Sequence, residues 1–147
     1  MKLPDVNFWL ALILSKHTHH NAAQAWLEGE NERASLHFCR ATQQGLVRLL
    51  TTAAVFSPYG NRPLTNREAW EVYAQFKKDE RIAFAQEPPG IEATWKILAT
   101  LDASSPKLWM DAYLAAFAIT GEMRLVTLDR GFRSFEAKGL DLCLLNP

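Results

Sequence analysis

The sequence lacks several features that would assign it to a broad class at once. It has only two cysteines, Cys39 and Cys143, which lie far apart with no Cys-x-x-Cys pair and no cysteine-histidine cluster. It therefore shows no sign of a disulfide framework or a structural zinc site, and a reduced, cytoplasmic setting fits best. It also lacks net charge, because 16 basic side chains balance 16 acidic ones. Any binding to a polyanion must then come from a local basic patch.

Long apolar runs are also missing. No segment reaches the roughly 18 apolar residues of a membrane-spanning helix. The apolar residues 8–14 resemble the core of a short secretory signal, with a possible cleavage site at 23–25. However, Asp5 cancels the charge of Lys2, and residues 16–20 are too polar for a cleavage region. With 147 residues and 48% hydrophobic content the chain can bury one sizeable core, so we expect a single domain over residues 1–147 without a membrane segment.

The apolar pattern alternates between strands and helices. Thr65 with Glu68 is a capping-box signature for a helix that begins at residue 66, and Ser105-Pro106 offers a cap followed by proline at the first helical position. We expect strands at residues 3–6, 34–39, 82–84, 124–128 and 140–145, and helices at 7–15, 20–30, 42–52, 66–78, 91–101 and 106–120. This alternation predicts an α/β fold, a three-layer α/β/α domain with a central, mainly parallel sheet.

Three aspartates lie where apolar segments end or turn. Asp5 follows the first apolar run, Asp129 follows the strand at 124–128, and Asp111 has apolar helical neighbours at i−3, i+3, i+4 and i+7. Ligands of open parallel sheets bind beyond the carboxyl ends of the strands. Carboxylates brought together repel one another and raise at least one pKa, and a divalent cation is the usual remedy. The sequence therefore predicts a hard-metal site.

Each aspartate also has a purely structural interpretation. Asp5 can cap the helix that follows it, although Asn7 is an equally good cap and leaves Asp5 spare. Asp129 can be an ordinary turn residue. A buried Asp111 can be neutralised by an arginine. The candidates for that partner are Arg48 and Arg124.

The segments around the aspartates resemble the motifs of PIN domains. Residues 3–7 (LPDVN) are similar to the N-terminal motif, residues 110–116 (MDAYLAA) to the third acidic motif and residues 125–132 (LVTLDRGF) to the fourth. Residues 19–27 and 45–51 are similar to the branch of the family that holds the VapC toxins. This resemblance implies a Mg²⁺- or Mn²⁺-dependent endoribonuclease, usually a homodimer, held inactive by a VapB-type antitoxin.

The resemblance also implies roles for individual side chains. Asp5, Asp111 and Asp129 would hold the Mg²⁺ or Mn²⁺ ion, and water on the ion would attack the scissile phosphate of the RNA. Three further residues would orient the ligands or the water: Asn7, Thr127 and Gln44. Three arginines would contact RNA, although each can also be a solvated surface charge: Arg48, Arg130 and Arg133. We expect the antitoxin to cover helices between about residues 41 and 70.

Two departures from the family pattern concern the site and the sheet. PIN domains often carry a glutamate on the helix after the second strand, whereas residues 40–44 (RATQQ) contain no acid. One metal ligand is then missing, and a glutamine can supply a neutral oxygen in its place. Pro4 removes a hydrogen-bond donor from what should be a central strand, so that position faces no partner or the strand begins late.

Two rival functions fit parts of the pattern. The missing glutamate suits a catalytically inactive PIN-like binding module. An aspartate-based phosphotransfer domain also places aspartates at strand ends, but it needs a lysine after a late strand that the region around Asp129 does not supply. Tryptophans at residues 26, 70 and 95 could stack on bases, yet their helical spacing with apolar residues favours the core or a dimer interface. The histidines within residues 17–20 favour a solvated turn over a metal tract.

Overall fold

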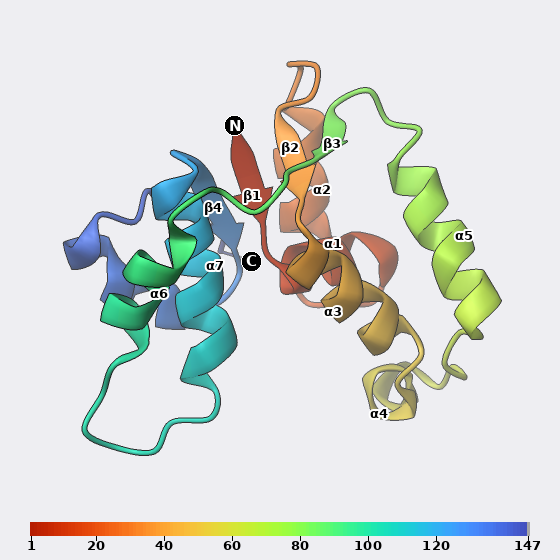
Figure 1. The fold of residues 1–147 in the computed structure, drawn as a ribbon. Helices are drawn as coiled ribbons and strands as arrows, with labels where there is room; N and C mark the ends of the chain where they lie inside the picture. Colours follow the sequence, from red (N-terminus) through yellow and green to blue (C-terminus); the bar gives the residue numbers. More distant parts are fainter. Residues whose placement is uncertain (147) are drawn as a thin grey trace.

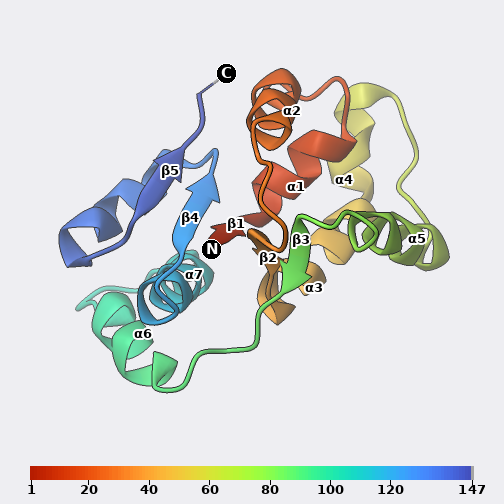
Figure 2. The same ribbon diagram turned by 90° about the horizontal axis from the view of Figure 1, so that it is seen from above.

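One five-stranded parallel sheet organises the chain. The computed structural model describes residues 1–146, so Pro147, the last residue of the predicted domain, lies outside the described residues. The strands are β1 (Lys2–Pro4), β2 (Leu36–Phe38), β3 (Ile82–Phe84), β4 (Arg124–Thr127) and β5 (Leu142–Leu144). They lie in the order β3-β2-β1-β4-β5 with every pairing parallel. Helices cover both faces of the sheet (Figures 1 and 2), which confirms the predicted three-layer α/β/α fold.

The first face of the sheet carries an aromatic core. Trp9 stacks on Phe38 with ring centroids 4.1 Å apart and 16° between the planes, and both side chains are fully buried. Val126 of β4 points into this core, whereas its neighbour Leu125 points to the opposite face, as the alternation of a strand requires. The helices on this face are α1 (Val6–Ile13), α2 (His20–Glu28), α3 (Arg40–Leu50), the short α4 (Ala53–Phe56) with the 3-10 turn η1 (Ser57–Tyr59), and α5 (Asn66–Phe76).

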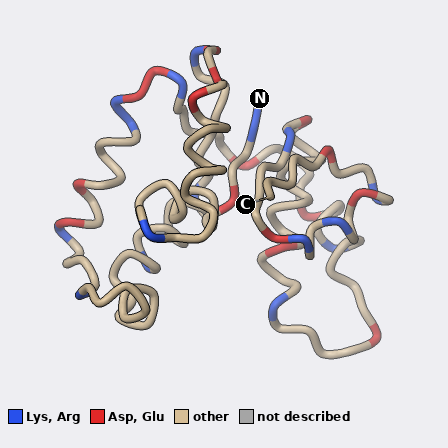
Figure 3. The backbone as a smooth tube through the Cα atoms, turned by 180° about the vertical axis from the view of Figure 1, so that it is seen from behind, with Lys and Arg blue, Asp and Glu red and all other residues tan. Residues whose placement is uncertain are grey.

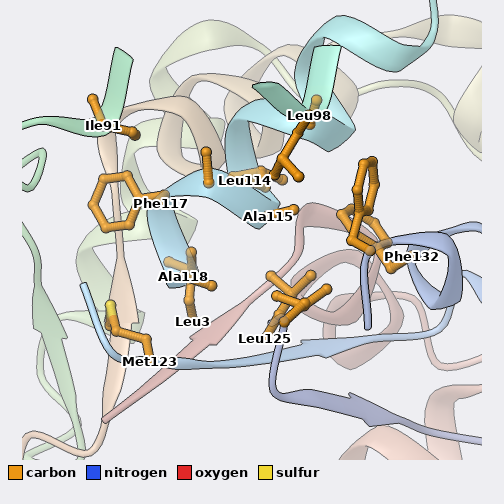
Figure 4. Packing of buried hydrophobic residues seen from close by; sticks show 14 of the residues in the cluster. Leu3, Ile91, Leu98, Leu114, Ala115, Phe117, Ala118, Met123, Leu125 and Phe132 are labelled. Atoms are coloured by element: carbon orange, nitrogen blue, oxygen red, sulfur yellow. The ribbon is translucent and has the colours of Figure 1, made fainter. Parts of the chain in front are cut away.

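The second face of the sheet carries an alanine-rich core. Its helices are α6 (Ile91–Ala99), α7 (Leu108–Thr120) and the 3-10 segment η2 (Arg130–Lys138). Ala115 and Ala118 of α7 lie over Leu3 and Leu125 of the two central strands (Figure 4), and all four are fully buried. Because alanine side chains are short, α7 approaches the sheet closely. The start of α7 is thereby held near the carboxyl ends of β1 and β4.

Several element boundaries agree with the sequence prediction. The strand at residues 82–84 and the start of α5 at Asn66 are confirmed. The capping box forms as expected, since the Thr65 hydroxyl accepts from the Glu68 amide and the Glu68 carboxylate accepts from the Thr65 amide, each at 3.1 Å. The predicted Ser105 cap of α7 is wrong. Lys107 is the N-cap, and the Ser105 carbonyl instead accepts from the Leu108 amide at 3.1 Å.

Other differences have local causes. The helix predicted at 42–52 begins two residues earlier, because the Thr42 hydroxyl accepts from the Cys39 amide at 3.0 Å and caps the helix there. The short helix α4 and the segment η2 were not predicted.

Cys39 and Cys143 are both free. Within residues 1–146, no helix is long and apolar enough to cross a membrane.

Pro4 ends the ladder between β1 and β2. The Lys2 amide donates to the Ser35 carbonyl on the β2 side, and the Asp5 amide donates to the Val126 carbonyl on the β4 side. By alternation, the amide that Pro4 lacks would face β2. The register of β1 and β2 comprises only the pair of Lys2 with Leu36, so the proline position has no ladder partner there. Its carbonyl is used within α1, where it accepts from the Trp9 indole at 3.2 Å.

Candidate functional site

Asp5 joins β1 to α1 and is held through both of its carboxylate oxygens. The residue is only 8% exposed. Its Oδ1 accepts from the Val6 amide at 2.6 Å, and its Oδ2 accepts from the Thr127 hydroxyl at 3.0 Å. Asp5 is thus the N-cap of α1, and the expectation that Asn7 would cap this helix and leave Asp5 spare is wrong. Asn7 already lies inside the first turn because the helix begins immediately after Asp5.

Thr127, the last residue of β4, connects two of the three aspartates. Its hydroxyl donates to Asp5 Oδ2 and accepts from the Asp129 amide, each at 3.0 Å. The Asn7 carboxamide oxygen accepts from the Leu128 amide at 3.3 Å. Two of the three residues expected to orient the site, Asn7 and Thr127, therefore tie the end of β4 to the start of α1.

Asp129 and Asp111 approach the site from different elements. Asp129 is exposed, and its Oδ1 accepts from the Gly131 amide at 2.7 Å, so the predicted turn role is confirmed for one oxygen. Asp111 is half-buried in the first turn of α7. The alternative interpretation of Asp111, neutralisation by an arginine, is wrong. No salt bridge in residues 1–146 involves Asp111, and Arg124 pairs with Asp141 at 3.0 Å.

Burial and neighbouring charges raise the pKa values of Asp5 and Asp111. Burial raises the pKa of Asp5 to about 6, and the charges of Asp111 and Asp129 add to this rise, while the hydrogen bonds from Thr127 and Val6 oppose it. The pKa of Asp111 is raised as well, first by burial and then by the charge of Asp129. In the part of the chain that the structure describes, no three histidine, cysteine or acidic side chains lie close enough together to surround a metal ion by themselves.

A pocket of about 310 Å³ opens beside Asp5 and Asp111, and we call it the acidic pocket. Gln44 and Arg48 of α3 reach it and are exposed, so these two predicted residues lie at the site. It is lined by Asp5, Val6, Ala41, Gln44, Gly45, Arg48, Leu49, Met110, Asp111 and Leu114. The pocket thus lies between α3 and α7, above the start of α1.

Arg130 and Arg133 are not part of this pocket. Both are exposed on η2, near Asp129 in the sequence. Over the whole molecule, acidic and basic residues are interspersed along the chain (Figure 3). A basic contribution to the acidic pocket therefore comes from Arg48 alone among the three predicted arginines.

Sequence reasoning missed Gly45, which shapes the pocket. A Cβ at this position would lie 2.7 Å from Val6 Cγ2, closer than real Cβ contacts allow. Glycine therefore lets α3 approach the residue that follows Asp5. The available signal was a lone glycine inside a helical pattern, which often marks a close packing contact. Gln43, in the segment that lacks an acid, is buried and accepts from the Arg40 guanidinium, which leaves Gln44 as the glutamine at the pocket.

A model of the PIN-domain family matches residues 2–138. The chain belongs to the PIN-domain family. This PIN domain is 54% identical over 146 residues to Ribonuclease VapC41 of Mycobacterium tuberculosis, with 99% of both chains covered, which places it in the VapC branch. The resemblance noted in the sequence is confirmed, and it decides against a phosphotransfer domain.

Solved structures share the PIN fold at low sequence identity. VapC20 of Mycobacterium tuberculosis, described as a sarcin-ricin loop cleaving toxin, superposes with a TM-score of 0.64 at 15% identity and covers 95% of this chain and 96% of its own. VapBC2 of Rickettsia felis, solved on a DNA fragment from its promoter, gives a TM-score of 0.58 at 12% identity and covers 99% and 98%. PIN-domain ribonucleases generally use a divalent metal ion.

Proposed function

We propose that this PIN domain is a divalent-metal-dependent endoribonuclease and the toxin of a VapBC-type toxin-antitoxin pair. The observation that carries the proposal is the 54% identity, over nearly the full length, to a protein named Ribonuclease VapC41. Asp5 and Asp111 at the acidic pocket supply the matching chemistry. The enzyme is a hydrolase that cuts RNA phosphodiester bonds.

The donor set suits Mg²⁺ or Mn²⁺. Asp5, Asp111 and Asp129 would hold the ion, since hard cations prefer carboxylate oxygens. Mg²⁺ usually keeps several waters and uses one or two carboxylates, which agrees with a site where three acids do not close around a point. A bound ion of this kind lowers the pKa of water and neutralises charge on phosphate. Gln44 offers a neutral oxygen at the pocket in place of the missing glutamate.

The remaining residues hold the site and meet the substrate. The Thr127 hydroxyl fixes Asp5 Oδ2 and the Asp129 amide, so both acids keep a defined orientation. Asn7 secures the Leu128 amide beside them. Arg48 faces the acidic pocket and is available to an RNA phosphate, whereas Arg130 and Arg133 would contact the backbone farther along.

Its partners follow from the same family assignment. The substrate is RNA, and a VapB-type antitoxin inhibits the enzyme by covering helices between about residues 41 and 70. The toxin is a homodimer of single-domain chains that acts in the cytoplasm. A solved relative, VapBC2 of Rickettsia felis, supports an antitoxin partner.

RNA cleavage by purified protein tests the function. Wild type is incubated with structured RNA and Mn²⁺, with and without EDTA, beside Asp111→Asn and the matched control Asp102→Asn, which changes an exposed loop aspartate. We expect EDTA to abolish cleavage, Asp111→Asn to lower kcat/KM more than about 100-fold, and Asp102→Asn to behave as wild type. If wild type and Asp111→Asn are equally inactive and neither binds Mn²⁺ by calorimetry, the protein is instead a PIN-like binding module.

A further inference from the structure

Trp70 on α5 is an anchored but exposed aromatic side chain. The sequence favoured the core or a dimer interface, yet 58% of this residue is exposed, so the core assignment is wrong. Its indole packs edge-on against Tyr73, with ring centroids 6.2 Å apart and 76° between the planes. This contact orients the indole and leaves much of its surface open to a ligand.

A second pocket lies beside this indole, and we call it the α3–α5 pocket. Helices α3 and α5 pack against each other (Figures 1 and 2), and the pocket between them measures about 250 Å³. It is lined by Val47, Arg48, Thr51, Asn66, Ala69 and Trp70. Arg48 lines the acidic pocket as well, so the two pockets share this residue.

The groups around the α3–α5 pocket match the parts of a nucleotide. An exposed indole offers a face for stacking, which is tolerant of base identity. Asn66 carries an amide that can both donate to and accept from a base edge. Arg48 forms no salt bridge in residues 1–146, whereas the nearby Glu68 is already paired with Arg62 at 3.0 Å. A positive charge next to the indole is therefore available to a phosphate.

We propose that the α3–α5 pocket binds one unpaired base of the RNA, next to the nucleotide that is cleaved at the acidic pocket. The base stacks on Trp70, its edge meets Asn66, and the connecting phosphate lies on Arg48. The substrate class is single-stranded or loop RNA, because a base paired within an A-form helix cannot turn onto an aromatic side chain. This inference rests on the ribonuclease function proposed above and adds the determinant of substrate choice.

RNA binding tests the pocket independently of cleavage. A fluorescein-labelled loop RNA is titrated into the full-length Asp111→Asn protein, and into the same protein with Trp70→Ala, Trp70→Phe or Trp109→Ala. Trp109 is the matched control, because it is also 58% exposed but lies on α7 outside both pockets. We expect Trp70→Ala to weaken binding about ten-fold, Trp70→Phe to retain most of the affinity, and Trp109→Ala to change nothing.

Abasic substitutions locate the base. In the cleavage-competent protein, single abasic nucleotides are placed at each position flanking the cleavage site, and KM and kcat are measured separately. At one position the abasic RNA should raise KM by about the same ten-fold as Trp70→Ala, and the two changes together should add nothing further.

Two outcomes overturn the proposal. If the Trp70→Ala and parent proteins bind RNA with equal affinity, Trp70 does not stack on a base, even if wild type cleaves RNA. If Trp70→Ala keeps its RNA affinity but binds the cognate antitoxin more weakly, the α3–α5 pocket binds the antitoxin and not RNA. Absence of metal-dependent cleavage with a Trp70-dependent affinity for loop RNA would instead refute the nuclease while retaining the RNA pocket.

Discussion

Asp5 and Asp129 lie at the two ends of one hydrogen-bonded connection through Thr127, but their surroundings differ sharply. Asp5 is buried, uses both oxygens within the protein and has its pKa raised to about 6. Asp129 is exposed and caps η2 with one oxygen. The free-energy cost of keeping a carboxylate ionised is therefore higher at Asp5, at the end of β1, than at the exposed Asp129. Burial is the leading cause, ahead of the charges of the neighbouring acids.

Replacing Asp5 and Asp129 in turn by asparagine should give the largest difference in the free energy of unfolding. At pH 7 in EDTA, Asp5→Asn should raise the free energy of unfolding by up to about 3 kcal/mol, because it removes an ionised buried group while asparagine remains a good N-cap. Asp129→Asn should change it by less than about 0.5 kcal/mol, since the side chain is exposed. Urea denaturation measures both values. If Asp5→Asn is less stable than wild type, the ionised carboxylate does not destabilise the folded protein at this position.

The pH dependence of stability should carry the same signature. Because the pKa of Asp5 rises from its ordinary 3.8 to about 6 on folding, the folded state binds more protons than the unfolded state between these values. The free energy of unfolding in EDTA should therefore fall as pH rises from about 4 to about 6 and level off above. Other groups titrate too, so the measurement is the difference between wild type and Asp5→Asn in urea at each pH. A constant difference across this window would refute the assignment.

A substitution that crowds the helix start beside Asp5 should change the free energy of unfolding by somewhat less. Gly45→Ala places a Cβ 2.7 Å from Val6 Cγ2, so we expect a loss of about 1–3 kcal/mol in unfolding free energy. Val6→Ala should relieve most of this loss in the double variant. Gly29→Ala is the control, because its nearest neighbour is 3.4 Å away. If Gly45→Ala is as stable as Gly29→Ala, the two helices have room to separate.

Removing the Thr127 hydroxyl, which connects Asp5 with the Asp129 amide, should have the smallest effect of these changes. Thr127→Val removes the hydroxyl that serves Asp5 Oδ2 and the Asp129 amide, so kcat/KM with Mn²⁺ should fall about ten-fold. Thr127→Ser keeps the hydroxyl and should restore most of the activity. Equal rates for the valine and serine variants would mean that the metal alone orients the acids.

Much of the fold could be predicted because the local sequence signals agreed with the tertiary structure. The capping residues Thr65 and Glu68 determine their helix start by themselves, and the strand at 82–84 has the same bounds in the sequence prediction and in the structure. The cap of α1 was misassigned because Asp5 and Asn7 are equally good cap residues, and the sequence does not show that Asp5 accepts from both the Val6 amide and the distant Thr127 hydroxyl. The four-residue helix α4 was missed since one turn shows no period.

For the candidate site, the sequence supplied the three aspartates but not the packing around them. Asp5 and Asp129 were singled out at strand ends, Asp111 by its apolar helical neighbours, and all three by motif resemblance. Apolar spacing predicts that Trp70 lies on a helix, but it cannot show how much of that side chain α3 covers. The role of Gly45 depends on the distance between two helices, which a single sequence does not contain.

The proline in β1 has a consequence for how the sheet opens. β1 shares three register pairs with β4 but one with β2, so the pairing of β1 with β2 is the shortest between neighbouring strands of the sheet. Asp5 and Asp129 follow β1 and β4 on one side of this pairing, whereas α3 follows β2 on the other side. The acidic pocket therefore lies across the strand pairing with the fewest register pairs in the described sheet. Amide exchange would show this short pairing as faster deuterium uptake along β2 and the first turn of α3 than along β4.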